Sequence, residues 1–129
     1  MREVMYPCPC CGFLVFDGPP GTTFRICPIC FWQDDESSLR YATIPDGPNH
    51  ASLVDAQRNF AAFGACELRL KKHVRAPTAT DQRDPGWRPI DPKIDVLDTS
   101  HDAGYTPWPT DMTKLYYWRA DYWLGAHRQ

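Results

Sequence analysis

The chain reads Cys8-Pro9-Cys10-Cys11-Gly12 near its start and Cys27-Pro28-Ile29-Cys30 further on, and these two stretches decide the fold. Pairing Cys8 with Cys11 and Cys27 with Cys30 gives the spacing C-x2-C-x15-C-x2-C, which is typical of four thiolates around one zinc ion. Each C-x2-C turn brings two sulfurs to the ion, and two turns complete a tetrahedron. If Cys10 replaced Cys11 as a ligand, the spacing would be C-x-C, in which the two sulfurs are less well placed to bind one metal ion. We therefore predict a structural zinc site made by Cys8, Cys11, Cys27 and Cys30.

Two further cysteines stand outside this set, Cys10 beside the site and Cys66 well apart from it. We interpret Cys66 as a small core side chain and Cys10 as a bystander. A thiol redox switch at Cys10 is an alternative, as are a redox dithiol or disulfide pairing of the four cysteines. The sequence shows no apolar run of signal-peptide or membrane-span length, so we expect a cytoplasmic protein with reduced thiols.

The residues between the two cysteine pairs predict a β-hairpin. Residues 13–16 and 22–26 are rich in β-branched and aromatic side chains, and residues 17–21 carry the Gly and Pro of a turn. An isolated hairpin is marginal in water, so a metal ion that clamps its ends is expected to supply the missing stability.

One amphipathic helix is predicted after the hairpin. Ser52 with Asp55 resembles a capping box at its start, and Gly64 is a suitable residue to end it. Leu53, Ala56, Phe60 and Phe63 recur at helical spacing, so one face of this helix should pack on the hairpin.

Together these motifs resemble the bacterial cysteine-rich CPCC family over roughly residues 5–76. The matching stretches are Tyr6-Pro7-Cys8-Pro9-Cys10-Cys11-Gly12, Ile26-Cys27-Pro28-Ile29-Cys30-Phe31-Trp32-Gln33-Asp34-Asp35, Gly47-Pro48-Asn49, Ser52-Leu53, Ala56, Asn59-Phe60 and Gly64. The resemblance implies a zinc-ribbon-like protein with the same four cysteine ligands and no known enzymatic activity. Some small families of this kind are immunity proteins encoded beside bacterial toxins. The Glu that follows the Trp in this motif is Gln33 here.

The second half of the chain predicts less regular structure. Residues 77–110 are rich in Pro and are expected to form an irregular segment, with one edge strand at residues 93–97. We expect an aromatic C-terminal helix within residues 111–127, capped by Thr110 and ended by Gly125. The whole is a small α+β fold whose zinc-binding domain covers residues 1–76, with the C-terminal helix packed on it.

The charge pattern limits the classes of partner. The chain has 14 Lys+Arg and 16 Asp+Glu, whereas a nucleic-acid-binding domain is usually strongly basic. Residues 65–93 nevertheless hold 7 basic and 4 acidic side chains. Arg69, Lys71, Lys72 and Arg75 therefore support an alternative reading as a zinc-ribbon nucleic-acid-binding or regulatory protein, with a solvated face as the simpler interpretation.

Protein binding is the favoured function. No Ser nucleophile motif, phosphate-binding loop or H-E-x-x-H helix is present, so we expect no enzyme. Tyr, Trp and Arg dominate protein-interface hot spots, and acidic side chains suit a basic partner. The candidate partner-binding residues are Asp34, Asp35, Glu36, Trp108, Tyr116, Tyr117, Trp118, Arg119, Tyr122 and Trp123. The sequence thus predicts a non-catalytic, zinc-stabilised protein-binding module, with an immunity protein that neutralises a cognate bacterial toxin as its plausible biological form.

Overall fold

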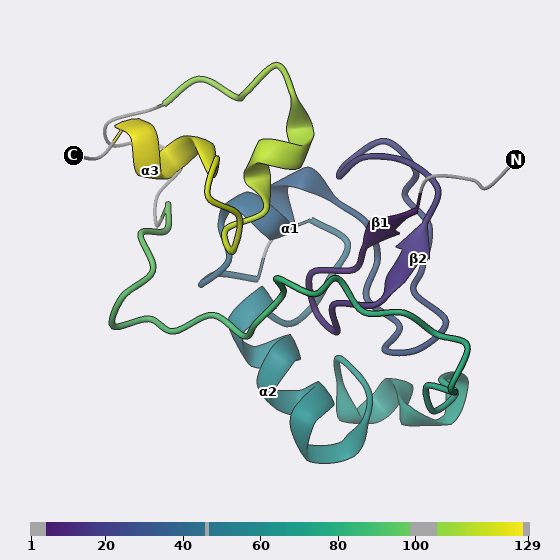
Figure 1. Cartoon of the computed structure of the whole chain (residues 1–129). Coiled ribbons are helices and arrows are strands. Elements are labelled where there is room, and N and C mark those ends of the chain that lie inside the picture. The colour runs from purple at the N-terminus through teal and green to yellow at the C-terminus, as the bar shows by residue number, and fades with distance from the viewer. Residues whose placement is uncertain (1–4, 46, 99–105, 128–129) are drawn as a thin grey trace, which may run out of the picture.

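The computed structural model describes residues 5–45, 47–98 and 106–127. Its elements follow the chain from the paired strands through α2 to the C-terminal turns (Figure 1). They are β1 (Tyr6–Pro7), β2 (Leu14–Phe16), α1 (Glu36–Arg40), α2 (Leu53–Phe63), η1 (Leu68–His73), η2 (Met112–Leu115) and α3 (Trp123–His127). In the described part of the chain, the helices are too short or too polar to cross a membrane.

The hairpin exists, but its predicted pairing is wrong. β2 pairs antiparallel with β1, which precedes the first cysteine pair, and not with residues 22–26. Within the predicted return strand only Ile26 forms a bridge, to Gln33. The Asp34 carboxylate accepts hydrogen bonds from the backbone N–H groups of Gly21 and Thr23, at 2.9 and 3.1 Å, and these hold the segment as a loop.

The helix predicted after residue 52 is confirmed as α2. The Ser52 hydroxyl accepts a hydrogen bond from the Asp55 N–H at 3.1 Å, so the N-cap is the expected one. Gly64 ends the helix in the left-handed conformation with φ of 85°, which glycine adopts without steric cost. Leu53 and Ala56 are fully buried and anchor α2 on the cysteine-rich core.

The predicted continuous C-terminal helix is wrong. The structure has the short 3-10 helix η2, then turns, then α3, which includes Gly125 instead of ending before it. Asp111, not Thr110, caps η2 through the Thr113 N–H at 3.0 Å. A continuous helix would spread the aromatic side chains around its whole circumference, whereas the broken path lets Tyr116, Tyr117 and Trp123 all turn inward.

The edge strand predicted at residues 93–97 is also absent. Both Ile94 and Asp95 donate their N–H groups to the Asp91 carbonyl, which makes a turn. The Asp95 carboxylate closes this turn by accepting from the Asp91 N–H at 2.7 Å and from Arg88 at 2.6 Å. Local carboxylate bonding therefore overrides the alternating apolar pattern.

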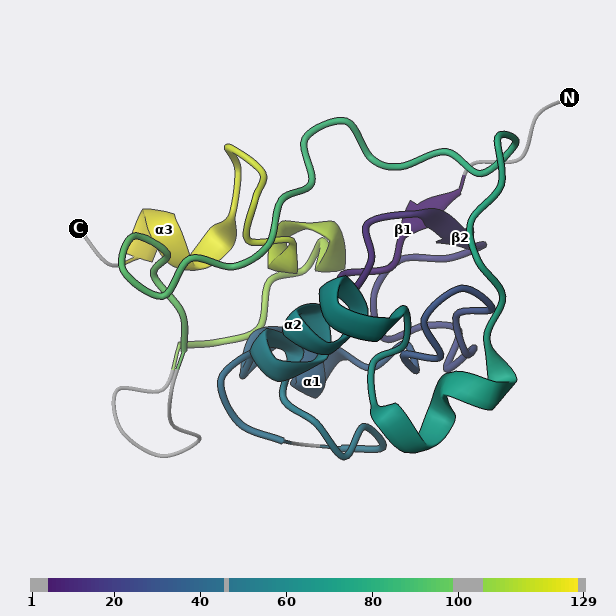
Figure 2. The ribbon, with the colours of Figure 1, turned by 90° about the horizontal axis from the view of Figure 1, so that it is seen from below.

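Residues 77–98 run as a strap from η1 back across the molecule (Figure 2). Leu14 donates its N–H to the Gln82 carbonyl at 2.8 Å, and Asp84 donates to the Gly12 carbonyl at 2.8 Å. The Trp87 indole N–H also reaches the Pro9 carbonyl at 2.9 Å. The strap thus supplies hydrogen-bond partners to backbone N–H and carbonyl groups in and beside the first cysteine turn.

One buried cluster joins the cysteine turns, α2 and the C-terminal segment. Leu53, Leu115 and Leu124 lie in it together with the cysteine side chains. Gln57 of α2, which is only 5% exposed, bridges these parts. Its amide nitrogen donates to the Pro9 carbonyl at 2.9 Å and to the Tyr117 hydroxyl at 2.8 Å, and its amide oxygen accepts from the Ile90 N–H at 2.8 Å.

Replacing Gln57 by Ala should lower the free energy of unfolding by about 2–4 kcal/mol, because it leaves buried hydrogen-bonding groups unpaired and opens a small cavity. Arg58→Ala on the exposed side of α2 is the matched control and should change stability by less than about 0.5 kcal/mol. Chemical unfolding of the two variants measures the difference. Equal stabilities would contradict the bridging role of Gln57.

Candidate metal centre

The first cysteine turn is held by a compact set of backbone hydrogen bonds. The Cys8 N–H donates to the Phe13 carbonyl at 2.9 Å, and the Gly12 N–H donates back to the Cys8 carbonyl at 2.6 Å. Gly12 has φ of 81°, and a Cβ there would lie 2.6 Å from the Trp87 ring. Glycine is therefore required at this position both by conformation and by space.

The second cysteine turn repeats the first. The Cys27 N–H donates to the Trp32 carbonyl at 2.8 Å, and the Phe31 N–H donates to the Cys27 carbonyl at 2.9 Å. Phe31 occupies the place of Gly12 and has φ of 72°. The Ile29 N–H also points at the Cys27 sulfur, at 3.4 Å, as expected of a turn that stabilises a thiolate.

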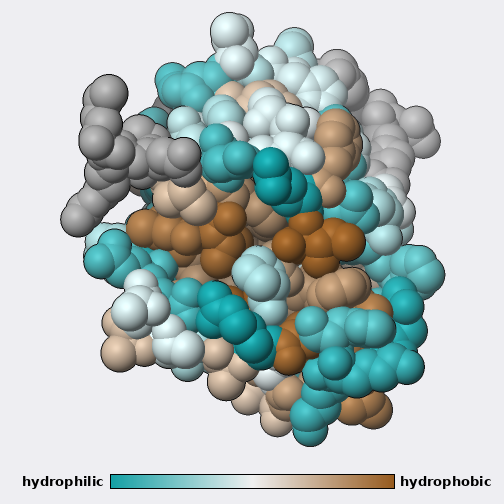
Figure 3. Space-filling view, turned by 90° about the vertical axis from the view of Figure 1, so that its right-hand side faces the viewer, coloured by the Kyte–Doolittle hydropathy of each residue, from teal (hydrophilic) through white to brown (hydrophobic). Residues whose placement is uncertain are grey.

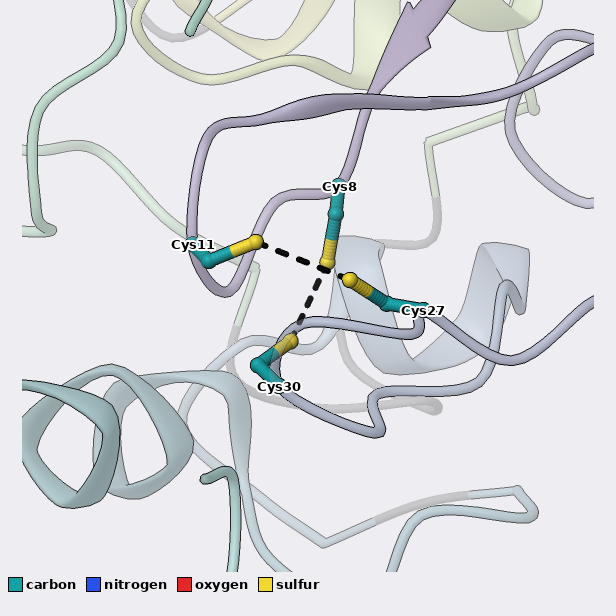
Figure 4. Close-up of side chains that lie close together, drawn as sticks. All are labelled: Cys8, Cys11, Cys27 and Cys30. Carbon is teal, nitrogen blue, oxygen red and sulfur yellow. Dashed lines mark hydrogen bonds between the residues drawn. The ribbon is translucent and has the colours of Figure 1, made fainter. Parts of the chain in front are cut away.

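The two turns bring their four sulfur atoms together, as Figure 4 shows. All four lie within 4.8 Å of one another, with 3.5 Å between Cys8 and Cys30 and 3.7 Å between Cys11 and Cys27. These separations are far longer than a disulfide bond of about 2.05 Å. They match the edge of roughly 3.8 Å in a tetrahedron whose metal–sulfur bonds are about 2.3 Å. The predicted ligands Cys8, Cys11, Cys27 and Cys30 thus fit one metal ion.

Burial and electrostatics also suit a cation. Each of the four cysteines has 0% exposure. Burial raises the pKa of the Cys8 and Cys30 thiols well above the usual range, whereas hydrogen bonds from Cys11 and the other thiols hold the pKa of Cys27 far below it. Several thiolates cannot share so small a buried space without a compensating positive charge, which a metal ion would supply.

Cys10 and Cys66 lie beside this cluster as buried thiols. Cys10 is fully buried next to Cys30, and burial raises the pKa of its thiol. Burial likewise raises the pKa of Cys66 to about 12, and its N–H donates to the Cys30 carbonyl at 2.7 Å. Reactive cysteines are accessible and have a lowered pKa, and Cys10 has neither property. The redox role of Cys10 stays a prediction that its surroundings do not favour.

The acidic residues predicted to meet a partner are used within the fold. Asp34 is only 4% exposed and binds the Gly21–Thr23 loop. Asp35 caps α1 by accepting from the Ser38 N–H at 2.9 Å. Glu36 stands in the first turn of α1 with its carboxylate against Gly21. Structural contacts thus account for Asp34 and Asp35, and partner binding by the three residues stays a prediction.

The predicted aromatic surface is largely core. Tyr116, Tyr117 and Trp123 are 1%, 6% and 5% exposed, so these three candidate partner-binding residues lie in the core, and partner binding by them stays a prediction. The Tyr117 hydroxyl donates to the Arg88 carbonyl, and the Trp123 indole donates to the Pro107 carbonyl at 3.0 Å. Burial satisfies their polar ends as well as their rings.

The other members of that patch are partly buried. They are Trp108, Trp118, Arg119 and Tyr122. The Trp118 indole N–H and the Arg119 guanidinium both contact the Asp84 carboxylate at 3.1 Å. Although burial opposes the effect, these donors and the Gly86 N–H hold the pKa of Asp84 below its usual value. The contacts tie the C-terminal segment to the strap.

Sequence reasoning missed Arg83, which contacts the first cysteine turn, and Arg40, which joins α1 to the C-terminal half of the chain. The Arg83 Nε–H donates to the Cys11 carbonyl at 2.9 Å, and its guanidinium lies 4.6 Å from the centre of the Phe13 ring. Arg40 has 0% side-chain exposure, pairs with Asp98 at 2.9 Å and lies 4.6 Å from the Trp108 ring centre. Neither stands in a recognisable motif, because each depends on partners more than 50 residues away.

The fold and this cluster define a small protein of short helices and a two-stranded antiparallel sheet, with a buried four-cysteine centre suited to a metal ion. A family model described as Cysteine-rich CPCC matches residues 6–81, which is more than half of the chain. The chain belongs to this family, and the resemblance drawn from the sequence is confirmed. No curated protein and no solved structure matches it.

Cys27→Ser should remove bound metal and abolish cooperative unfolding, because the serine hydroxyl is a poor substitute for a thiolate ligand. Cys10→Ser is the matched control, since Cys10 is equally buried but outside the ligand set. Metal content per chain and thermal unfolding distinguish the two variants. Equal metal loss from both would contradict the assignment of ligands.

Proposed function

We propose that this chain is a zinc-stabilised protein-binding module without catalytic activity. The observation that carries the proposal is the complete burial of the four clustered cysteines. A tetrahedral site with four protein ligands leaves no position for water or substrate, unlike the three-ligand sites of zinc enzymes. In this proposal the metal holds the two turns together and does no chemistry.

Zinc is the metal that we propose for the cluster. Thiolates favour zinc and iron, and zinc is bound by four cysteines in many small structural domains. The burial of the sulfurs and the N–H group aimed at the Cys27 sulfur suit a zinc ion held by four thiolates. We also propose that the domain is a zinc ribbon, because its two cysteine turns resemble the two metal-binding turns of that fold.

Protein binding follows from what the surface offers. Phe24 and Ile26 are 55% and 45% exposed close to the second cysteine turn, and together they offer apolar contact area to a protein partner. An immunity protein, which neutralises a cognate bacterial toxin by covering it, is the biological form that we propose for this binding role. Such a function needs a stable surface and no active site.

Nucleic-acid binding is the second candidate. Arg69, Lys71, Lys72 and Arg75 are exposed on or just after η1, and His73 stacks on Phe31 with ring centres 5.2 Å apart. Arg75 forms an ion pair with Asp81 at 2.8 Å, which neutralises one of these four basic side chains. The remaining basic surface is therefore small for phosphate binding.

Chelation should release one zinc ion per chain and unfold the cysteine turns, because the energy of metal binding is also folding energy. Lowering the pH should act in the same direction, since protonated thiols do not bind the metal. Elemental analysis and far-UV circular dichroism with and without added zinc provide the measurement. An unchanged spectrum and melting curve in the metal-free protein would contradict a stabilising role.

Purification from the native cell should recover a protein partner at constant stoichiometry. Recovery of nucleic acid alone, with an affinity that falls steeply as salt rises, would favour the second candidate. Washing the captured complex at low and moderate salt separates these outcomes, because counterion release dominates nucleic-acid binding. A partner protein that persists at moderate salt supports the proposal.

A further inference from the structure

A pocket of about 140 Å³ opens between the second cysteine turn, residues 48–51 and the start of η1. Its apolar lining includes Ile26, Phe31 and Leu70. Its polar lining includes His50 and the ion-paired Glu67 and Arg69. Pockets for metabolites usually enclose about 300–1,000 Å³, so this one has room for a single apolar side chain. Figure 3 shows apolar surface gathered across the middle of the hairpin face, with hydrophilic side chains around it.

Two aromatic residues near this pocket have an unfavourable backbone conformation. Among the described residues, Phe24 and Phe31 are the non-glycine residues with positive φ, at 55° and 72°. The first cysteine turn makes the same hydrogen bonds with glycine in the place of Phe31, so the turn itself does not require a side chain there. Phe24 is 55% exposed and gains little from packing. Strain of this kind is typical of functional sites.

Phe24 adjoins the pocket through its backbone. Its carbonyl accepts a hydrogen bond from the Gln33 side chain at 3.0 Å, and Gln33 lines the pocket. Ile26, two residues further on, lines the pocket and is 45% exposed. The strained aromatics and the pocket therefore form one surface.

The charge beside this surface is positive. Residues 65–76 hold Arg69, Lys71, Lys72 and Arg75. Glu67 pairs with Arg69 and Asp81 pairs with Arg75, so the positive charge left beside the pocket is that of Lys71 and Lys72. Lys71 and Lys72 are exposed on η1, next to His73, which stacks on Phe31. Arg69 lies at the rim of the pocket, 2.9 Å from Glu67 and 3.1 Å from His50. The exposed Lys71 and Lys72 beside the pocket attract acidic groups and repel basic ones.

We propose that this surface docks an acidic segment of a partner protein and takes one apolar side chain of that segment into the pocket. We call it the Phe31 surface and define it by Phe24, Ile26, Phe31, Arg69, Leu70, Lys71 and Lys72. The inference rests on the proposed protein-binding function and supplies its location and the chemistry of its partner. It replaces the acidic and aromatic surface predicted from the sequence, whose members the fold mostly uses internally.

The test uses the full, zinc-loaded chain and peptide probes followed by NMR of the backbone amides. One probe is a nine-residue peptide of Asp and Glu with a single central Leu. It should shift the amides of the pocket residues at 26, 31–33, 49–51, 66–67 and 69–70. The same peptide with a central Ala should bind on the order of tenfold more weakly, because it loses the buried side chain. A Lys-flanked Leu peptide should not bind.

Two sets of variants locate the binding. Lys71→Glu with Lys72→Glu should weaken the acidic Leu peptide by about tenfold or more, through reversal of the charge beside the pocket. Phe24→Gly should weaken it without lowering the melting temperature, because glycine removes the strain. Ile94→Ala is the matched control, since Ile94 is exposed but lies outside this surface, and should leave binding unchanged.

Several outcomes would overturn the inference. These are no amide shifts at millimolar acidic Leu peptide, shifts confined to other residues, or displacement of the peptide by a single-stranded oligonucleotide that binds the same amides more tightly. If a native partner still bound the Lys71→Glu, Lys72→Glu chain, the Phe31 surface would not be the binding site, although the proposed protein-binding function would still hold. If the wild-type chain kept its fold and stability without zinc, the proposed zinc-stabilised function would be contradicted, whereas the peptide mapping would still hold.

Discussion

The convergence of four buried cysteine sulfurs is the constraint on which the rest of this structure depends. Two turns with the same backbone hydrogen bonds present these sulfurs, Cys8 and Cys11 from one turn and Cys27 and Cys30 from the other. Little regular secondary structure surrounds them, because the strands are only two and three residues long. A protein of this size with so small a sheet cannot rely on backbone ladders, so the side chains that meet at the cluster connect its parts.

The strap and the C-terminal segment complete the site from the outside. Residues 82–84 bond to the backbone of the first cysteine turn, and Trp87 packs where a Cβ on Gly12 would stand. Gln57 then connects that turn to Ile90 and Tyr117. The residues beyond the cysteine-rich region are thus part of one core, and their aromatic richness reflects packing more than recognition.

Because most of the aromatic tail is buried, the surface proposed to bind a partner lies on another part of the molecule. The surface around Phe31 combines a small pocket, strained aromatics and an adjacent basic helix, which separately are unremarkable features of a small protein. Their juxtaposition arises because Phe31 immediately follows a cluster cysteine and stacks on His73 of η1. The same turn that positions a sulfur therefore also positions a candidate contact residue.

The sequence alone determined the features that depend on local chemistry. The ligand set followed from C-x2-C spacing, and α2 followed from Ser52, Gly64 and helical periodicity, since each is encoded within a few residues. Only the tertiary structure decided the partner of β2, the broken path of the tail and the burial of Tyr116, Tyr117 and Trp123. These depend on groups distant in sequence, such as Gln82 beside Leu14 and Arg88 beside Tyr117. An aromatic residue has the same sequence pattern in a core and at an interface, and only its neighbours in space decide between the two.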